Sequence, residues 1–303
     1  MSTNPWKYVQ VDADGLENNP YLNPPPKPAL PIPPAHNAEP ATPVTVTTLD
    51  DFLILQNLTC VDADGRVFEQ YPELLVRKDI FRNGASQINF TPYQAIVHCQ
   101  GQGLFLPSMA LSCNIVAVLF QQAVRLESDG TYTTINPDVK KVLDQYKDHG
   151  AGYGWQAQNT VIDYNHQKII HYPHDADFTT HGGTSNVNSS RPRTELPFQK
   201  VSGIWPVKKT LENMTLEDGL KHPLVSKFVK QFTGLANPSI LIPIGQYFQK
   251  QAKVWFPTSP VKAEDCTETR AAWFGCISDS LDLDGDDNLN YNDAGRGVRL
   301  GAP

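Results

Sequence analysis

The alternation of hydrophobic and polar positions predicts a folded body that starts near Leu49. In LTCVDADGRVFEQ an apolar strand pattern lies on each side of an Asp-Gly pair, which is typical of a β-hairpin whose second strand ends near Gln70. NTVIDYNHQKIIHYP alternates in the same way and turns at Asn165 and His166. The pattern therefore predicts two antiparallel hairpins in the first two thirds of the chain.

Helical spacing separates the two hairpins. TPYQAIVHC begins with Thr-Pro, a common helix start, and residues Met109–Leu126 are apolar nearly all round, which predicts a buried central helix. A third helix is bounded by Asn136 as N-cap, Pro137 at its first position and Gly150 after its end. Hairpins and helices together favour a central α+β body.

The pattern after residue 205 is mainly helical. Thr215 and Asp218 form a capping-box pattern, and the helix that it opens is expected to end before Gly234. Further helices are predicted over 243–255 and 264–280. The last hundred residues are therefore expected to be a mostly helical region.

Residues 20–43 contain ten prolines, which favour the extended polyproline II conformation. This stretch is either a flexible linker, or an arm that lies along a neighbouring subunit or binds an aromatic groove. The expected organisation is a proline-rich arm over 1–48, an α+β body over 49–205 and a mainly helical region over 206–303.

Composition narrows the class of protein. Hydrophobic residues make up 40% and aromatic residues 10% of the 303 positions, which is typical of a globular chain. The net charge is −7, and from Glu264 onward nine acidic residues face three arginines. Because no cluster of lysine and arginine is present, we expect no nucleic-acid partner and no binding to an anionic membrane surface.

The chain carries no signal-peptide pattern at its N-terminus, and its longest apolar runs, NIVAVLF and SILIPI, are too short to cross a bilayer. There are five cysteines. Cys266 and Cys276 are expected on one helix, about 15 Å apart, which is too far for a disulfide. Synthesis in the cytoplasm without membrane insertion is expected, and incorporation into an exported particle or virion stays open.

The stretch LDLDGDDNLNYND holds the most specific motif. It resembles the twelve-residue calcium loop of the EF-hand family, and that resemblance implies Ca²⁺ bound by oxygen ligands. The residues that match are Asp282, Asp284 and Asp286 at the first, third and fifth positions, Asn288 at the seventh and Asp293 at the twelfth.

The motif departs from the EF-hand pattern at two positions. Asp287 stands at the sixth position, where the family has glycine, and Asp293 replaces the bidentate glutamate, which weakens calcium binding. The sequence AGRGVRLGAP that follows is not a helix pattern, so the second helix of the motif is missing. The resemblance covers about 30 residues, and the alternative is a solvated acidic turn.

Four of the eight histidines lie in HQKIIHYPHDADFTTH, which leads into a polar stretch that ends near residue 200. Imidazole and carboxylate groups at a strand end can bind zinc or another transition metal. The best ligand set here is His171, His174 and Asp177. The alternative is a polar loop without a metal.

Cys113 precedes an apolar helical run, and a thiol near a helix start can act as a nucleophile. His166 or His171 would then be the base, and Gln100 or Gln102 would stabilise an oxyanion. The alternative is a buried thiol, because free cysteine is among the most frequently buried residues.

Two functions follow from the sequence. The first is a non-catalytic structural or assembly protein of a larger particle, of the virion, phage-tail or secretion-apparatus type, which docks on protein subunits through residues 1–48 and is stabilised by calcium. The second is a cysteine hydrolase that uses Cys113 with His166 or His171.

Overall fold

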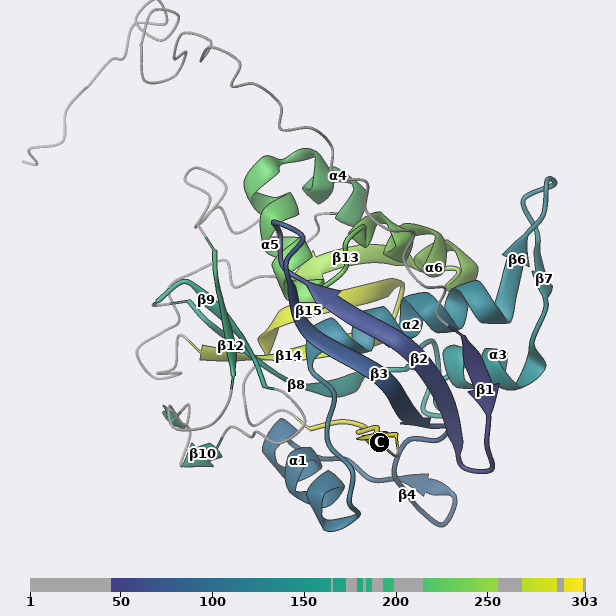
Figure 1. The fold of residues 1–303 in the computed structure, drawn as a ribbon, viewed down its shortest axis with the longest axis horizontal. Helices are drawn as coiled ribbons and strands as arrows, with labels where there is room; N and C mark the ends of the chain where they lie inside the picture. The colour runs from purple at the N-terminus through teal and green to yellow at the C-terminus, as the bar shows by residue number, and fades with distance from the viewer. Residues whose placement is uncertain are drawn as a thin grey trace, which may run out of the picture. The chain divides into compact units, whose positions relative to one another are not determined.

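The fold was analysed in a computed structural model (Figure 1). Contacts divide the chain into two units, Met1–Thr42 and Pro43–Pro303. Nearly all of the predicted arm lies outside the described residues. The structure describes residues 45–164, 166–172, 179–181, 184–186, 193–198, 215–255, 269–287 and 292–301.

A six-stranded sheet in the order β12-β9-β8-β14-β15-β13 forms one layer of the folded unit. Its neighbours are antiparallel, except that β13 runs parallel to β15. The strands are β8 (Gln156–Asp163), β9 (Lys168–His171), β12 (Thr194–Pro197), β13 (Gln251–Trp255), β14 (Thr269–Ile277) and β15 (Ser280–Asp287).

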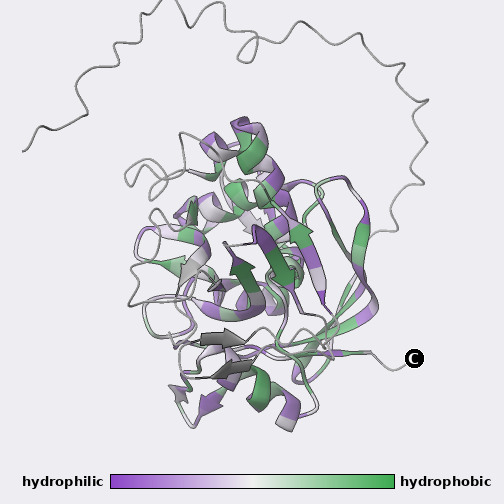
Figure 2. Ribbon diagram, turned by 90° about the vertical axis from the view of Figure 1, so that its left-hand side faces the viewer, coloured by the Kyte–Doolittle hydropathy of each residue, from purple (hydrophilic) through white to green (hydrophobic). Residues whose placement is uncertain are grey.

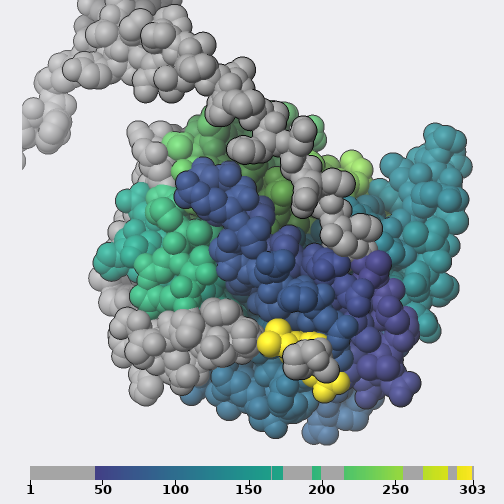
Figure 3. Space-filling model, in the orientation of Figure 1, coloured from purple at the N-terminus to yellow at the C-terminus, as the bar shows by residue number. Residues whose placement is uncertain are grey.

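A second sheet has the order β1-β2-β3-β16 and joins the two ends of the folded unit. The last strand lies beside β3, and Figure 3 shows the C-terminal residues in yellow next to the residues of the first hairpin. The strands are β1 (Val46–Thr48), β2 (Phe52–Val61), β3 (Val67–Arg77) and β16 (Val298–Leu300). Two-stranded pairs are β4 (Arg82–Asn83) with β5 (Ser86–Gln87), β6 (Val124–Leu126) with β7 (Tyr132–Thr134), and β10 (Thr179–His181) with β11 (Thr184–Asn186).

Helix α2 lies at the centre of the hydrophobic core. It contacts α3, α5, β2 and β14, and most of its residues are buried. This confirms the buried central helix that the all-round apolar pattern predicts. Figure 2 shows the hydrophobic positions of the folded unit in green along its helices and strands. The helices are α1 (Pro92–Gly101), α2 (Met109–Ala123), α3 (Pro137–Asp144), α4 (Leu216–Lys221), α5 (Pro223–Thr233) and α6 (Leu241–Phe248), with a 3₁₀ turn, η2 (Pro238–Ile240), before α6.

Local signals gave the turn of the first hairpin and three helix starts correctly, but β3 continues to Arg77 and does not end near Gln70. Asp62 Oδ1 accepts the backbone N–H groups of Asp64 and Arg66, each at 2.9 Å, and Gly65 takes a positive φ of 82° in the same turn. The predicted hairpin of β8 and β9 is present as well. The predicted N-caps each accept a backbone N–H of the first turn and are Thr91, Asn136 and Thr215.

The helix predicted over 264–280 is wrong. Thr269–Ile277 is strand β14, which lies between β8 and β15 at the middle of the sheet. A strand buried on both faces shows no alternation, so a short apolar run does not distinguish it from a helix. The helix predicted over 243–255 is also only half right, because α6 ends at Phe248 and β13 follows.

The predicted boundary near residue 205 does not separate two bodies. β14 and β15 from the second predicted region share one sheet with β8 and β9 from the first, and β16 pairs with β3. The part expected to be mainly helical therefore contributes four strands. The mixed α+β class is confirmed for the described residues, and the helical character of the last hundred is corrected.

Candidate functional site

The first half of the acidic motif, residues 282–287, lies in strand β15. Asp282 pairs with Gly275 of β14 and Lys253 of β13, and both Asp282 and Asp284 are buried, at 2% and 7% exposure. In a strand, alternate side chains leave the same face about 6.6 Å apart along the chain. An EF-hand loop instead folds its ligands around one point. The segment 282–287 therefore does not have the EF-hand loop conformation.

Asp286 and Asp287 end β15, and Asn288 lies outside the described residues. Within the described ranges no group of three or more His, Cys, Asp or Glu side chains is placed to hold a metal ion. Calcium binding by this stretch accordingly stays a prediction, which depends on oxygen ligands at and beyond the end of the strand.

Asp293 takes part in a different contact, with the segment before α1. It forms a β-bridge with Phe90, in which Phe90 N–H donates to the Asp293 carbonyl at 2.8 Å and the reverse bond is 3.0 Å. Its Oδ1 accepts Gln87 Nε2 at 3.0 Å and the backbone N–H of Ala294 at 2.7 Å. Burial raises the pKa of this carboxyl to about 6.

His149 is a titratable residue close to Asp293. Its Nε2 lies 3.2 Å from the carbonyl oxygen of Trp155, which only accepts, so Nε2 carries the hydrogen. The same nitrogen is 3.9 Å from Asp293 Oδ1. Burial lowers the pKa of His149, and the neutral imidazole therefore makes a polar contact rather than an ion pair with the carboxylate.

Arg296 fastens the same C-terminal segment to the core. Its guanidinium is fully buried and lies 5.1 Å from the ring centroid of Tyr146. It donates to the side-chain oxygens of Gln156 and Gln145 and to two backbone carbonyls of the β3 end. The described polar side chains of residues 293–296 thus serve to hold the end of the chain in place.

The structure contradicts the role proposed for Cys113. The residue lies within α2, is fully buried among apolar side chains, and burial raises the pKa of its thiol well above the usual value. A nucleophilic cysteine needs a lowered pKa and access to substrate. Cys113 is therefore a core residue, as are the free cysteines Cys60, Cys99 and Cys276.

His171 is held inside the protein by two hydrogen bonds. Its Nε2 donates to the carbonyl oxygen of Gln231 at 2.9 Å, and its Nδ1 lies 2.9 Å from the Thr160 hydroxyl. The ring also stacks on Phe68 at 5.4 Å between centroids. Burial lowers the pKa of His171 to about 4. With both ring nitrogens engaged, this histidine is neither a base for Cys113 nor a metal ligand.

His166, the other candidate base, lies away from Cys113 and His171 at the tip of a hairpin. His166 is exposed at the tip of the β8–β9 hairpin, where its Nδ1 lies 2.7 Å from Asp163 Oδ2 and its backbone N–H donates to Asp163 Oδ1. His174 and Asp177 lie outside the described residues. His166 and His171 are close in sequence, but the first lies at the surface and the second in the interior. Gln100 is exposed on α1, and Gln102 contacts His98 and Arg77.

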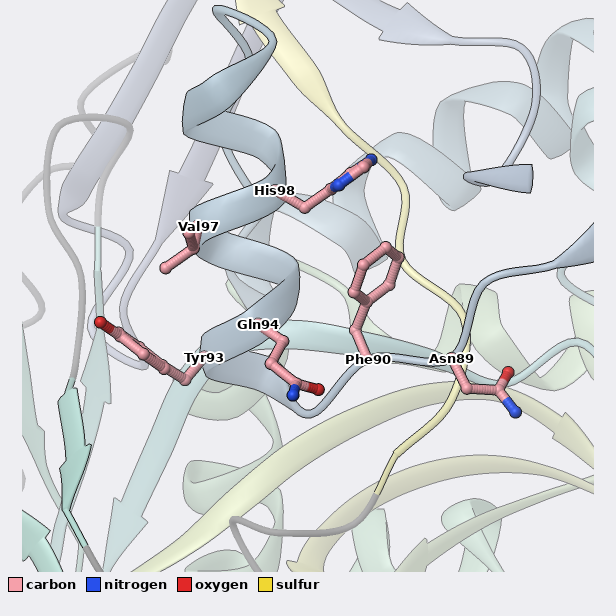
Figure 4. A pocket seen from close by; sticks show the side chains of 6 residues that line it. All are labelled: Asn89, Phe90, Tyr93, Gln94, Val97 and His98. Carbon is pink, nitrogen blue, oxygen red and sulfur yellow. The ribbon is translucent and has the colours of Figure 1, made fainter. Parts of the chain in front are cut away.

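A feature that the sequence analysis did not identify is a surface cleft over α1, here called the α1 cleft (Figure 4). Its volume is about 460 Å³. Phe90 forms its floor and is 7% exposed, whereas Val97 is a hydrophobic residue that is 47% exposed on a helix surface. The sequence signal for this cleft was Val97, a hydrophobic residue in the helix pattern that the fold leaves exposed. The lining residues are Asn89, Phe90, Tyr93, Gln94, Val97 and His98.

The α1 cleft carries no formal charge. His98 packs against Phe81 at 4.5 Å and Phe90 at 4.8 Å between ring centroids, and Gln102 Nε2 lies 2.7 Å from its Nε2. Burial and the nearby Arg77 lower the pKa of His98, so its imidazole is neutral. The other five lining side chains are aromatic, aliphatic or amide groups. Such a surface suits an uncharged, apolar ligand.

Gln87 connects the α1 cleft with the C-terminal segment. Its amide nitrogen donates to Asn89 Oδ1 at the rim of the cleft and to Asp293 Oδ1 in the interior. The side chain of Asn89 is thereby held by a hydrogen bond to its Oδ1.

No protein family model matches the chain, and no curated protein and no solved structure matches it either. Among the residues that the structure describes, none of the helices combines the length and the apolar character that a membrane span requires.

Proposed function

We propose that this protein is a non-catalytic structural component of a larger particle and that it docks on neighbouring protein subunits. One observation carries the proposal. The α1 cleft is exposed, uncharged and lined by aromatic, aliphatic and amide groups, which suits binding rather than chemistry. The particle type is that of a virion, a phage tail or a secretion apparatus, and residues 1–48 form the docking arm.

The interior supports a structural role. The buried side chains His149, His171 and Arg296 make hydrogen bonds to backbone carbonyls of other segments. Burial lowers the pKa of each of these three side chains and so favours its uncharged form. Groups of this kind tie segments together, and a catalytic acid or base would need contact with substrate.

Calcium forms a second part of the proposal. The acidic stretch that follows Gly285 would bind the ion and stiffen the chain before the segment that Asp293 and Arg296 hold in place. Bound calcium would then stabilise the folded unit at a subunit contact.

The native mass of the full chain, purified under gentle conditions from the cells that make it, tests the proposal. We expect a particle larger than one chain, with chelator decreasing its stability. A variant that begins at Pro43 keeps the compact unit and is expected to lose the assembly. A full chain that is a monomer both with and without chelator, and with no co-purifying subunit, overturns the proposed function.

A further inference from the structure

The side-chain amides of the α1 cleft present hydrogen-bond donors. Gln94 Oε1 accepts the backbone N–H of Thr91 at 3.0 Å, and Asn89 Oδ1 accepts Gln87 Nε2. Both amide oxygens thus accept hydrogen bonds from the protein itself, and the NH₂ groups remain as donors. Figure 4 shows the two side chains near Phe90. Beside them stand the rings of Phe90 and Tyr93. The cleft therefore fits an apolar ligand that is rich in acceptors and poor in donors.

A proline-rich segment has this chemistry. Proline keeps its carbonyl oxygen but has no N–H, and the polyproline II conformation leaves the carbonyls without internal hydrogen bonds. In residues 24–34, PPPKPALPIPP, only Lys27, Ala29, Leu30 and Ile32 have a backbone N–H. Lys27 is also the one charged side chain in this segment. The segment and the cleft therefore match in hydrogen bonding.

The spacing of the prolines matches as well. Polyproline II has three residues per turn, so side chains three apart lie along one edge. Pro25, Pro28, Pro31 and Pro34 follow this period in the sequence, so a polyproline II conformation would place their rings in one row. Proline rows of this kind bind grooves lined by aromatic side chains.

We propose that the α1 cleft binds residues 24–34 of a second copy of this chain. This inference rests on the proposed function and names the partner of the docking arm. Residues 35–44 separate the segment from the folded unit. These ten residues span about 30 Å when extended, which is enough to reach a neighbouring copy.

Cross-linking of the full chain tests the proposal. Tyr93 is replaced by a photoreactive benzoylphenylalanine, which keeps an aromatic side chain in the cleft. Isotopically heavy and light chains are mixed, irradiated and analysed by mass spectrometry. We expect cross-links between a heavy and a light chain that map to residues 24–34. Cross-links within one chain only, or cross-links to other segments only, overturn the proposal.

Paired variants measure the specificity of the contact. Val97→Asp places a charge in the cleft, and its control Gln100→Asp places the same charge on an exposed position of α1 outside the cleft. Pro28→Ala with Pro31→Ala interrupts the row of prolines, and the control is Pro24→Ala with Pro33→Ala. We expect each test variant to lower the yield of mixed cross-links about tenfold and each control to leave it unchanged.

Equal yields in test and control variants also overturn the inference. The native mass separates this outcome from failure of the proposed function. If the chain that begins at Pro43 loses the assembly while Tyr93 does not cross-link to residues 24–34, the arm binds elsewhere. If the full chain is a lone monomer, the proposed function itself fails.

Discussion

The hydroxyl of Ser108 lies 3.3 Å from both carboxyl oxygens of Glu69 and donates to them, while it accepts the backbone N–H of Leu111 at 3.1 Å. Ser108 is the N-cap of α2, so a buried carboxyl group lies beside the start of the central helix. The helix dipole favours the carboxylate, but burial dominates and raises the pKa of Glu69 to about 7.

The first prediction concerns Glu69→Gln. A raised pKa means that the folded state binds the proton more tightly than the unfolded state. The stabilisation is full below the unfolded pKa near 4.5 and is lost as pH rises through about 7. The neutral amide of the variant does not titrate, so its free energy of unfolding does not fall in this way. Between pH 5 and pH 8 we expect the free energy of unfolding of the variant to rise by about 2 kcal/mol relative to that of the native chain. Urea unfolding of both proteins at pH 5 and pH 8 measures this difference. The same change in the free energy of unfolding with pH in both proteins would contradict the prediction.

The second prediction concerns Thr160, whose oxygen accepts the backbone N–H of Met109 at 2.9 Å and contacts His171. Thr160→Val removes both bonds inside the core, and we expect a loss of about 1–3 kcal/mol in the free energy of unfolding. Thr134→Val on the exposed β7 strand is the matched control and should change it by less than about 0.5 kcal/mol. Thermal unfolding of the two variants measures both changes, and equal losses of stability would contradict the prediction.

The same interaction predicts the protonation of His171. Its pKa is lowered to about 4, so the neutral imidazole stabilises the fold above pH 6.5, and this contribution is lost as pH falls through about 4. Because Gln231 offers only a carbonyl oxygen, the hydrogen resides on Nε2. Nitrogen NMR of the ring at pH 6 should show a neutral Nε2–H tautomer. A protonated ring at that pH, or the Nδ1–H tautomer, would be inconsistent with the buried position.

Features that depend on neighbouring residues could be predicted from the sequence. The Asp62 turn and the caps at Thr91 and Asn136 need only side chains within four positions, and each forms as expected. Strand β14 could not be predicted in this way, because it pairs not only with the adjacent β15 but also with β8, which is distant in sequence. Its apolar run carried no period that separates strand from helix.

The candidate site was limited by the same cause. The sequence identified Cys113 and His171 as reactive residue types, but their chemistry is set by burial and by partners such as Gln231, sixty positions away. The α1 cleft was missed because its lining depends on the rings of Phe81 and Phe90 packing against His98. The spacing of these residues along the chain does not predict that their rings pack together.

The fourth prediction concerns Arg296, which joins the C-terminal segment to the end of β3 and to the C-cap of α3. Arg296→Met keeps much of the volume and leaves buried carbonyls without their donor, so we expect a loss of about 3 kcal/mol or more. Arg299→Met, on the exposed strand β16, is the control and should cost less than about 1 kcal/mol. Equal decreases in the free energy of unfolding of the two variants, measured with urea, would show that Arg296 does not hold this segment in place.

The last prediction concerns calcium. Bound ligand at a hundred times its Kd stabilises a folded protein by about 2.7 kcal/mol, so we expect calcium to raise the melting temperature of the full chain and chelator to reverse the rise. Asp286→Asn should abolish the effect, because it removes a charged oxygen at the end of β15. Asp279→Asn is the control, since that carboxylate is exposed and pairs with Lys253. A melting temperature that does not respond to calcium would mean that the aspartates of β15 bind no calcium, because a ligand that binds only the folded state must raise its stability.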